Sequence, residues 1–209
     1  MGTAERKERE KLQRRKDIID AAEIVFFEKG FDNTTMDEIA NKVELSKGTL
    51  YLYFKSKEEL FLEIIKRGEK ILTNLFVKAI KKEKNGLDKV KALGEAFIKF
   101  STKYHDYNKA YMTDYPKIQE YRSEVGYTCE QNTNDGNSVF IEVIKEGIAD
   151  GSIRKNIDPV KTSLLLWGQT IGVLQIIQQK GDSLKSECNT TPEALLEYFF
   201  EYTGHALEA

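Results

Sequence analysis

The stretch between positions 46 and 54 carries side chains suited to touch a nucleic acid. An ammonium and several hydroxyls can donate hydrogen bonds to phosphates or base edges, and a glycine permits close approach. Leu50 and Phe54 lie four residues apart, which puts them on the core face of a helix and the polar side chains on its other faces. Such an outward face is typical of a helix that enters the major groove of DNA, although an ordinary helical hairpin is the alternative. The candidate contacts here are Ser46, Lys47, Gly48, Thr49, Tyr51 and Tyr53.

Short helices joined by a tight turn must position these side chains. Thr34 or Thr35 can cap the first helix. Ser46 can cap the second helix, which we expect over residues 47–54. A preceding amphipathic helix, from about residue 14 to 29, is expected to supply the third wall of a small core. The pattern therefore predicts a three-helix unit built around a helix-turn-helix.

Lys57 marks a further candidate phosphate contact. Ser56 can cap the next helix, and Glu59 three residues later completes a capping box. Lys57 then lies in the first turn, where the positive end of the helix dipole disfavours a cation. A bound anion would resolve this conflict, because a helix N-terminus with a lysine is a phosphate site. The alternative is an exposed lysine with no partner.

Residues 17–65, about a quarter of the chain, closely resemble the N-terminal domain of tetracycline-repressor-like (TetR/AcrR) regulators. The resemblance is carried by G-F-x-x-T-T-M-x-x-I-A, then S-K-G-T-L-Y-x-Y-F, then K-x-K-E-E-L. It implies an all-α homodimer with paired helices at its C-terminal end. It also implies that Thr35 is one of the DNA contacts and that the tyrosine hydroxyls and Lys57 contact the DNA backbone. Lys47, Gly48 and Thr49 are the expected base readers.

Composition bounds the other possibilities. The 209 residues are 40% hydrophobic and 32% charged with three prolines, as expected for a soluble, globular, helical chain. No apolar run is expected to span a membrane and no signal peptide is evident, so we expect a cytoplasmic protein. Two cysteines and two histidines without ligand spacing predict no metal and no cofactor, and a thiol redox sensor is disfavoured.

Charge is unevenly distributed, which matters because the whole chain carries a formal net charge of −2. Residues 1–16 hold seven Lys or Arg against three Glu, a local net charge of +4. We expect this basic arm to be a solvated, disordered tail. It could still add salt-dependent phosphate contacts.

The remainder predicts a C-terminal helical bundle. With a boundary between 1–55 and 56–209, we expect helices over residues 56–80, 87–104, about 118–150, 159–180 and 192–206. Polar loops are expected at 81–86 and 182–190. Aromatic side chains with hydroxyls can line a small-molecule pocket, although half-buried packing is their commoner role. The candidate effector-binding residues are Phe97, Phe100, Tyr104, Tyr107, Tyr111, Met112, Tyr115, Phe140, Trp167 and Gln169.

The helix over residues 159–180 is apolar nearly all round and must be buried on every side. A partner subunit in a two-fold dimer would bury it, and Gly168 and Gly172 would allow close approach of two helices. The core of a monomer is the alternative. The candidate dimer-interface residues are Leu166, Thr170, Val173, Leu174, Ile177, Leu196, Phe199 and Phe200.

These patterns predict a ligand-responsive transcriptional repressor that binds a pseudo-palindromic double-stranded DNA operator as a homodimer. A small, largely apolar or aromatic molecule is the expected effector. A helical-bundle carrier or protein-interaction module is the alternative. An enzyme is not expected, because the sequence has no Glu-x-x-His metal pair, no glycine-rich phosphate loop and no plausible Ser/His/Asp set.

Overall fold

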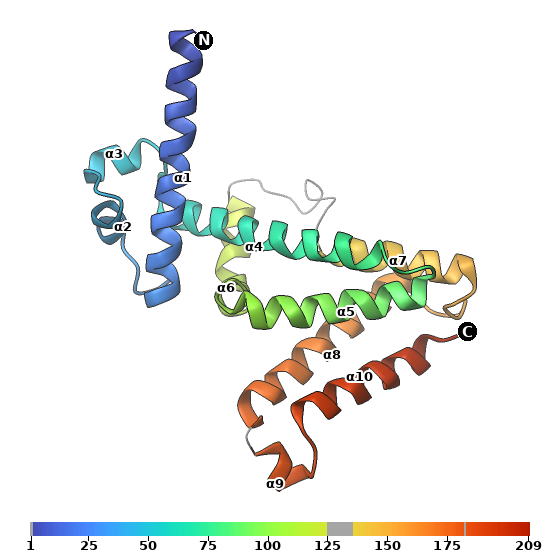
Figure 1. Cartoon of the computed structure of the whole chain (residues 1–209). Helices are drawn as coiled ribbons and strands as arrows, with labels where there is room; N and C mark the ends of the chain where they lie inside the picture. The colour runs from blue at the N-terminus through green and yellow to red at the C-terminus, as the bar shows by residue number, and fades with distance from the viewer. Residues whose placement is uncertain (1, 125–135, 182) are drawn as a thin grey trace. The chain divides into compact units, whose positions relative to one another are not determined.

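The computed structural model describes residues 2–124, 136–181 and 183–209, apart from the side chains of residues 3, 114–119, 122–124 and 137 (Figure 1). The described residues form helices and turns, with one isolated bridge between Ile153 and Glu208 and no extended strand. The all-α fold expected from the sequence is confirmed. The helices are α1 Thr3–Lys29, α2 Met36–Lys42, α3 Lys47–Tyr51, α4 Lys57–Ile80, α5 Gly86–Lys103, α6 His105–Glu124, α7 Gly136–Asp150, α8 Pro159–Lys180, α9 Leu184–Cys188 and α10 Pro192–Leu207.

The chain divides into two compact units. The first holds residues up to Lys70 together with the segment from Tyr104 that contains α6. The second holds Ile71–Lys103 and the C-terminal segment with α7, α8, α9 and α10. This division differs from the expected boundary between residues 55 and 56, because the first part of α4 and α6 both pack on α1. Helix α4 belongs to both units.

The first unit is built around the core-facing side of α1. Ile18 of α1, Ile39 of α2, Leu50 of α3 and Phe54 just after α3 are all 0% exposed. Burial of a side chain of this size stabilises a fold by about 1.5–3 kcal/mol. The positions expected for Leu50 and Phe54 are thereby confirmed, and they fix the side of α3 that faces away from solvent.

A polar cluster joins α1, α4 and α6 at the edge of this core. The two terminal nitrogens of Arg67 donate to Glu23 at 2.8 Å and to Asp20 at 2.7 Å. The hydroxyl of Tyr107 donates to the same Glu23 carboxylate at 2.6 Å. Burial, followed by the neighbouring Glu23 charge, raises the pKa of Tyr107, so this hydroxyl keeps its proton and acts as a donor.

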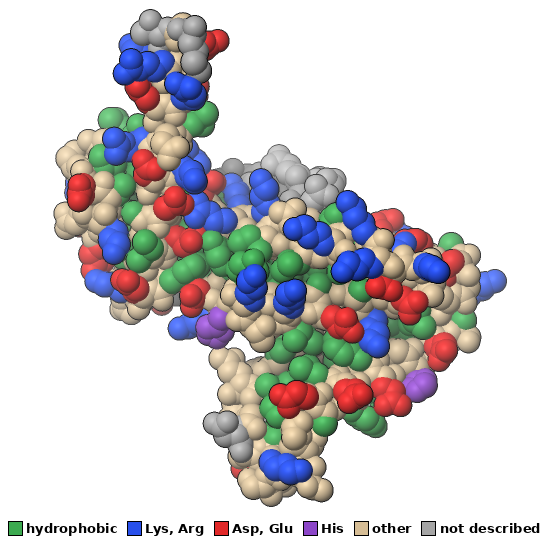
Figure 2. Space-filling model, in the orientation of Figure 1, with side chains coloured by type: hydrophobic (Ala, Val, Ile, Leu, Met, Phe, Trp, Pro, Cys, Tyr) green, Lys and Arg blue, Asp and Glu red, His purple; other side chains and the backbone are tan. Residues whose placement is uncertain are grey.

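Helix α1 begins eleven residues earlier than expected, because the basic arm is helical. Its first half contains strong helix formers, and local pairs hold it: Arg6 Nε lies 2.8 Å from Glu10 Oε1, and Gln13 donates to Asp17 at 2.8 Å. The prediction of a disordered tail was therefore wrong. Lys and Arg side chains cover much of this half of the helix (Figure 2).

The second unit depends on a close crossing of α5 and α7. A Cβ on Gly86 would lie 2.2 Å from the Cα of Gly147, so a side chain at this position would push the helices apart. The start of α5 is capped from the same C-terminal end of α7, since the backbone N–H of Gly86 donates to Asp150 Oδ2 at 2.8 Å. Helices α8 and α10 complete the bundle by packing on α7 and α5.

The caps of the two C-terminal helices follow the sequence. Asp158 accepts from the backbone of Val160 at 2.9 Å and of Lys161 at 3.0 Å, and Pro159 occupies the first helical position. Thr191 caps α10 through a bond from Ala194 at 3.2 Å. The expected helices over 159–180 and 192–206 are confirmed to within a residue.

Three expected elements are corrected. Helix α3 ends at Tyr51 rather than at 54, and the chain turns before Phe54. Residues 118–124 belong to α6, which starts at His105, so the expected helix start near 118 was wrong. Of the rest of the expected helix over 118–150, residues 125–135 lie outside the described residues and residues 136–150 form α7. The predicted loop over 182–190 contains the short helix α9.

Helix α8 is by length and composition apolar enough to cross a membrane, contrary to the expectation that no run reaches that length. Only 17% of its most apolar 18-residue window is buried in the single chain. A core helix of a soluble protein meets the same length and composition test. What distinguishes α8 is the outward apolar surface that the single chain leaves uncovered.

Candidate nucleic-acid interface and effector pocket

Thr35 begins α2 as its N-cap. Its hydroxyl oxygen accepts from the backbone N–H of Glu38 at 3.3 Å, and the Glu38 carboxylate accepts from the backbone N–H of Thr35 at 2.9 Å. Lys29 at the end of α1 donates to the same carboxylate at 2.5 Å. These bonds, with Lys29 first, lower the pKa of Glu38 to about 2. The cap expected at Thr34 or Thr35 is thus at Thr35.

Ser46 begins α3 in the same way. Its Oγ accepts from the backbone N–H of Thr49 at 3.1 Å and lies 2.8 Å from the Thr49 hydroxyl. The capping residue therefore also fixes the side chain of one expected base reader. A Cβ on Gly48 would meet nothing closer than the Ser46 oxygen at 3.9 Å, so this side of α3 is open.

Lys47 lies at the first position of α3 and forms an ion pair with Asp37 of α2 at 2.7 Å. Both side chains are 58% exposed. The Asp37 carboxylate raises the pKa of the Lys47 ammonium, which therefore stays charged. An exposed pair of this kind contributes little to stability, so a stronger anion such as phosphate can compete for the ammonium.

The remaining outward residues differ in exposure. The side chain of Tyr51 is 42% exposed and that of Leu52 is 83% exposed. Tyr53 is half-buried and packs against the core of the first unit. The sequence pattern did not single out Leu52, whose apolar side chain at the end of α3 could contact thymine methyl groups.

Lys57 has internal partners that the sequence could not reveal. Its ammonium donates to the backbone carbonyls of Phe31 at 3.0 Å and Thr34 at 3.2 Å, and it lies 4.6 Å from the centre of the Phe31 ring. The lysine thus binds the loop between α1 and α2. A phosphate contact by Lys57 stays a prediction, and it would have to share the ammonium with these carbonyls.

The turn between α2 and α3 contains a strained residue. Glu44 has a φ of +56°, in the left-handed region that favours glycine. The neighbouring backbone N–H of Leu45 donates to the carbonyl of Ala40 at 2.9 Å and closes the turn. This conformation fixes how α3 leaves α2.

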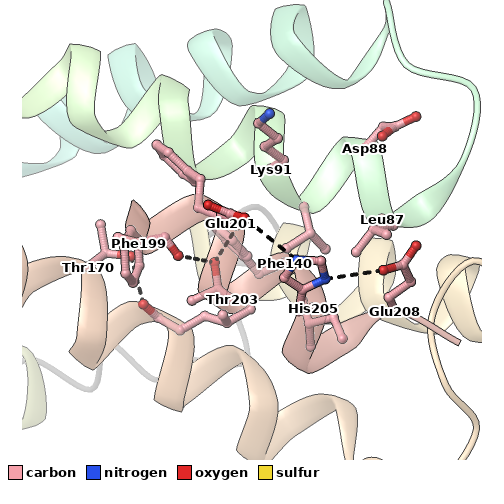
Figure 3. A pocket seen from close by; sticks show the side chains of 16 residues that line it. Leu87, Asp88, Lys91, Phe140, Thr170, Phe199, Glu201, Thr203, His205 and Glu208 are labelled. Carbon is pink, nitrogen blue, oxygen red and sulfur yellow. Dashed lines mark hydrogen bonds and ion pairs between the residues drawn. The ribbon is translucent and has the colours of Figure 1, made fainter. Parts of the chain in front are cut away.

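A pocket of about 230 Å³ lies in the second unit, between α5, α7, α8 and α10 (Figure 3). Its apolar wall includes Phe140, Leu166 and Phe199. A Cβ on Gly94 would lie 2.8 Å from Phe200, so glycine at this position lets α5 and α10 close one side of the pocket.

The rim of the pocket is polar. His205 lies between two carboxylates, 3.8 Å from Glu201 and 3.5 Å from Glu208 (Figure 3). Lys91 and Asp88 of α5 lie on the other side of the opening. The pocket therefore combines an aromatic interior with a charged entrance, which is typical of sites that orient a small molecule by one polar end.

The expected effector residues do not come together. Of the ten, Phe140 lines this pocket, while Phe97 and Phe100 are buried in the second unit. Trp167 is 41% exposed and Gln169 is exposed. Four of the expected residues belong to the first unit, where Tyr107 is part of the polar cluster and Tyr111 packs on the core. They are Tyr104, just before α6, and Tyr107, Tyr111 and Met112 on α6. The side chain of Tyr115 lies outside the described residues.

Three of the eight expected dimer residues are buried within their own bundle. Leu166 and Thr170 are 8% exposed and Phe199 is 9% exposed, and all three line the pocket. The others, Val173, Leu174, Ile177, Leu196 and Phe200, are half-buried. The dimer assignment of these eight residues stays a prediction. Because α8 is apolar nearly all round, its periodicity could not indicate which side faces the chain's own core.

The outward side of α8 carries different residues. Leu165 is 65% exposed and Ile176 is 46% exposed, while a Cβ on Gly168 or Gly172 would meet nothing within 4 Å. These four residues recur at spacings of three and four along α8 and form one stripe, which we call the outer stripe. On α10 the exposed rings of Tyr198 and Tyr202 stack with centroids 6.4 Å apart.

Residues 18–64 match the family model described as bacterial regulatory proteins, tetR family. The HTH-type transcriptional repressor KstR2 of Rhodococcus jostii (strain RHA1) is 32% identical over 157 residues, which cover 71% of this chain and 72% of that protein. The fold is similar to that of the fatty acid degradation regulator FadR from Bacillus halodurans, with a TM-score of 0.69, 19% identity and coverage of 90% and 93% of the two chains.

A further solved structure, AibR in complex with isovaleryl coenzyme A and operator DNA, shares the fold with a TM-score of 0.62 and 18% identity, covering 90% of this chain and 96% of that one. The capped helix-turn-helix, the helical second unit and the extent of the likeness to KstR2 all indicate the same family. The chain belongs to the tetR family of bacterial regulatory proteins and is a DNA-binding regulator of transcription.

Proposed function

We propose that this regulator is a repressor whose α3 reads the major groove of a pseudo-palindromic operator. The observation that carries the proposal is the outward side of α3, where Lys47, the open surface at Gly48 and the exposed Tyr51 surround a buried Leu50. Lys47, Gly48 and Thr49 then contact base edges. The hydroxyls of Tyr51 and Tyr53, with Thr35 and Ser46 at the two helix starts, contact phosphates.

Two copies are needed, because a single α3 of five residues reads only a few base pairs. In helix-turn-helix dimers the two reading helices lie about 34–36 Å apart, one turn of DNA. We place the dimer interface on the outer stripe of α8 and the exposed rings of α10. An apolar helix surface left uncovered by a single chain supports this placement, and its two glycines allow close approach.

The effector enters the pocket between α5, α7, α8 and α10. A volume of about 230 Å³ and a wall of aromatic and aliphatic side chains support a small, largely apolar or aromatic molecule. Its polar end would lie at the rim, near Lys91 and His205. To lower the affinity for the operator a hundredfold, such a molecule must bind the form that does not bind DNA more favourably than the DNA-binding form, by about 2.7 kcal/mol.

The proposal places the protein in the bacterial cytoplasm, where its operator lies, and gives it no catalytic role. KstR2, to which it is similar, is named a repressor rather than an enzyme.

Selection of duplexes from a random pool at physiological salt tests this proposal. The wild-type protein should enrich a palindromic sequence. Tyr51→Phe should weaken binding to all duplexes by a similar factor, because it removes a phosphate contact and reads no base. Lys47→Ala should change which sequence is enriched.

Thr102→Ser, a change at an exposed residue near the end of α5, serves as the control and should leave both properties unchanged. A wild-type protein that enriches no duplex would overturn the proposed function. If the Lys47→Ala variant enriches the same sequence as wild type, the protein binds DNA as proposed but Lys47 does not read a base.

A further inference from the structure

The side of α1 that packs on the core continues, toward the N-terminus, as a row of cations. Ile18 and Val25 on this side are 0% and 5% exposed. Lys7, Lys11 and Arg14 precede Ile18 by eleven, seven and four residues, which are the spacings of one side of an α-helix. These three residues, the cationic row, therefore face the same way as the core-facing residues, beyond the end of the core.

The three cations are available to bind an external anion. All three are exposed, and within the described part of the chain none of them forms a hydrogen bond or ion pair. Their neighbours differ: Arg6 pairs with Glu10 at 2.8 Å, and Arg15 pairs with Glu63 at 3.1 Å. Among the described residues, therefore, no carboxylate pairs with the cations of the row.

The row is rigid because it belongs to a continuous helix. At about 1.5 Å per residue, Lys7 and Arg14 are separated by about 10.5 Å along the helix axis. Phosphates on one strand of a duplex advance by about 3.4 Å each along the DNA axis. Three cations on one side of a helix can thus meet a short run of phosphates without loss of chain entropy.

The Arg14 end of the row adjoins the part of α1 that contacts the segment after the reading helix. The guanidinium carbon of Arg15, the next residue, lies 4.6 Å from the centre of the Phe54 ring, and Phe54 comes three residues after the end of α3. The row begins where the core beneath α3 ends. A membrane surface is a poorer partner, because Leu12 is the sole large apolar residue between positions 3 and 14 and cannot form an apolar face.

We propose that the cationic row binds the phosphate backbone of the operator next to the base pairs that α3 reads, and adds three phosphate contacts to each subunit. The inference rests on the proposed function, since it takes the same DNA as its partner. Binding by the row is independent of sequence, so it raises affinity and salt dependence without changing the preferred operator.

The test compares two triple variants with equal loss of charge. The row variant is Lys7→Gln, Lys11→Gln and Arg14→Gln, and the control variant is Arg6→Gln, Arg9→Gln and Lys16→Gln, on the other side of α1. Glutamine keeps helix propensity, and circular dichroism of the full-length proteins checks that the helix is retained. Affinity is measured over a range of salt concentrations. The DNA is a duplex that carries one half-site of the sequence selected by wild-type protein, and it is present in excess over the protein.

Log affinity falls with log salt, and for the row variant this fall should be less steep by about 2.7 per subunit. Between 50 and 200 mM salt, the wild-type protein should therefore lose about 40-fold more affinity than the row variant. The control variant should keep the wild-type slope. Equal slopes for wild type and row variant, or equal changes in both variants, would overturn the inference. If the row variant keeps the slope on DNA but loses binding to phosphatidylglycerol vesicles, the row binds lipid and the inference is also overturned.

The two failures are distinguishable. A wild-type protein that selects no duplex contradicts the proposed function itself. A wild-type protein that selects an operator, with variants that keep its salt slope, contradicts the role of the row alone.

Discussion

At the scale of single residues, Glu38 connects the end of α1 to the start of α2. Its carboxylate accepts from the Lys29 ammonium at 2.5 Å, and from both the backbone N–H and the hydroxyl of Thr35 at 2.9 Å. The ionised carboxylate makes all of these bonds, which is why its pKa is lowered to about 2 from 4.5. The start of the helix that precedes α3 is therefore stabilised by the charge of one half-buried side chain.

A pH dependence follows. Because the pKa of Glu38 is lower in the folded protein, its stabilising effect is fully present above pH 4.5 and is lost as pH falls toward 2. We expect Glu38→Gln to lower the urea midpoint of unfolding at pH 7, and the difference from wild type to shrink between pH 4.5 and pH 3. Glu44→Gln, at an exposed residue of the next turn, should show no such convergence. A difference between wild type and Glu38→Gln that stays constant with pH would contradict this account.

Local residue roles were predictable from sequence, and distant ones were not. Thr35 and Ser46 cap their helices through backbone groups three residues away, so residue type and position were enough to indicate them. Lys57 bonds carbonyls at least 23 residues away, and Tyr107 bonds a glutamate 84 residues away. No spacing rule links such pairs, and both residues were given binding roles where the structure shows internal hydrogen bonds.

At the scale of elements, the turn between α2 and α3 stores strain at Glu44. A residue other than glycine in the left-handed region costs about 1–3 kcal/mol, whereas glycine loses about 0.5–1 kcal/mol through its freedom in the unfolded chain. The side chain of Glu44 is exposed, so its loss removes no packing.

We therefore expect Glu44→Gly to raise the free energy of unfolding by about 1 kcal/mol, measured by urea denaturation at pH 7. Glu44→Ala removes the same carboxylate but keeps a Cβ, and it should stay near the wild-type value. If the alanine variant is stabilised as much as the glycine variant, charge rather than backbone strain explains the change.

Helices with caps and one apolar side were predicted well, and those without either were not. Asp158 with Pro159 and Thr191 with Pro192 fixed the starts of α8 and α10. The first half of α1 has almost no apolar residues, so its helical state rests on propensity and local ion pairs that a hydrophobic pattern does not detect. Helix α8 is the opposite case, since an apolar residue on every side hides which side is inward.

At the scale of the whole molecule, a single chain carries one α3 and can contact only one half of the proposed pseudo-palindromic operator. The outer stripe of α8 exposes Leu165 and Ile176, and α10 adds two exposed tyrosine rings. Apolar surface of this extent favours burial against a second copy, at about 25 cal/mol for each Å² removed from water. The same helices line the effector pocket on their inward side, so the pocket and the proposed interface share their walls.

This arrangement predicts that a charge on the outer stripe separates the subunits and weakens operator binding together. We expect wild-type protein at micromolar concentration to have a mass near twice 24.0 kDa by light scattering, and Leu165→Glu to have a mass near 24.0 kDa. An uncompensated carboxylate buried in the interface is costly, whereas it is solvated in the monomer. The monomer should then bind a single half-site as wild type does, but lose the added affinity for two half-sites. Val77→Glu places the same charge on another exposed apolar position, of α4, and should remain dimeric. A monomeric wild type, or a Leu165→Glu variant that stays dimeric, would show that the outer stripe is not the interface.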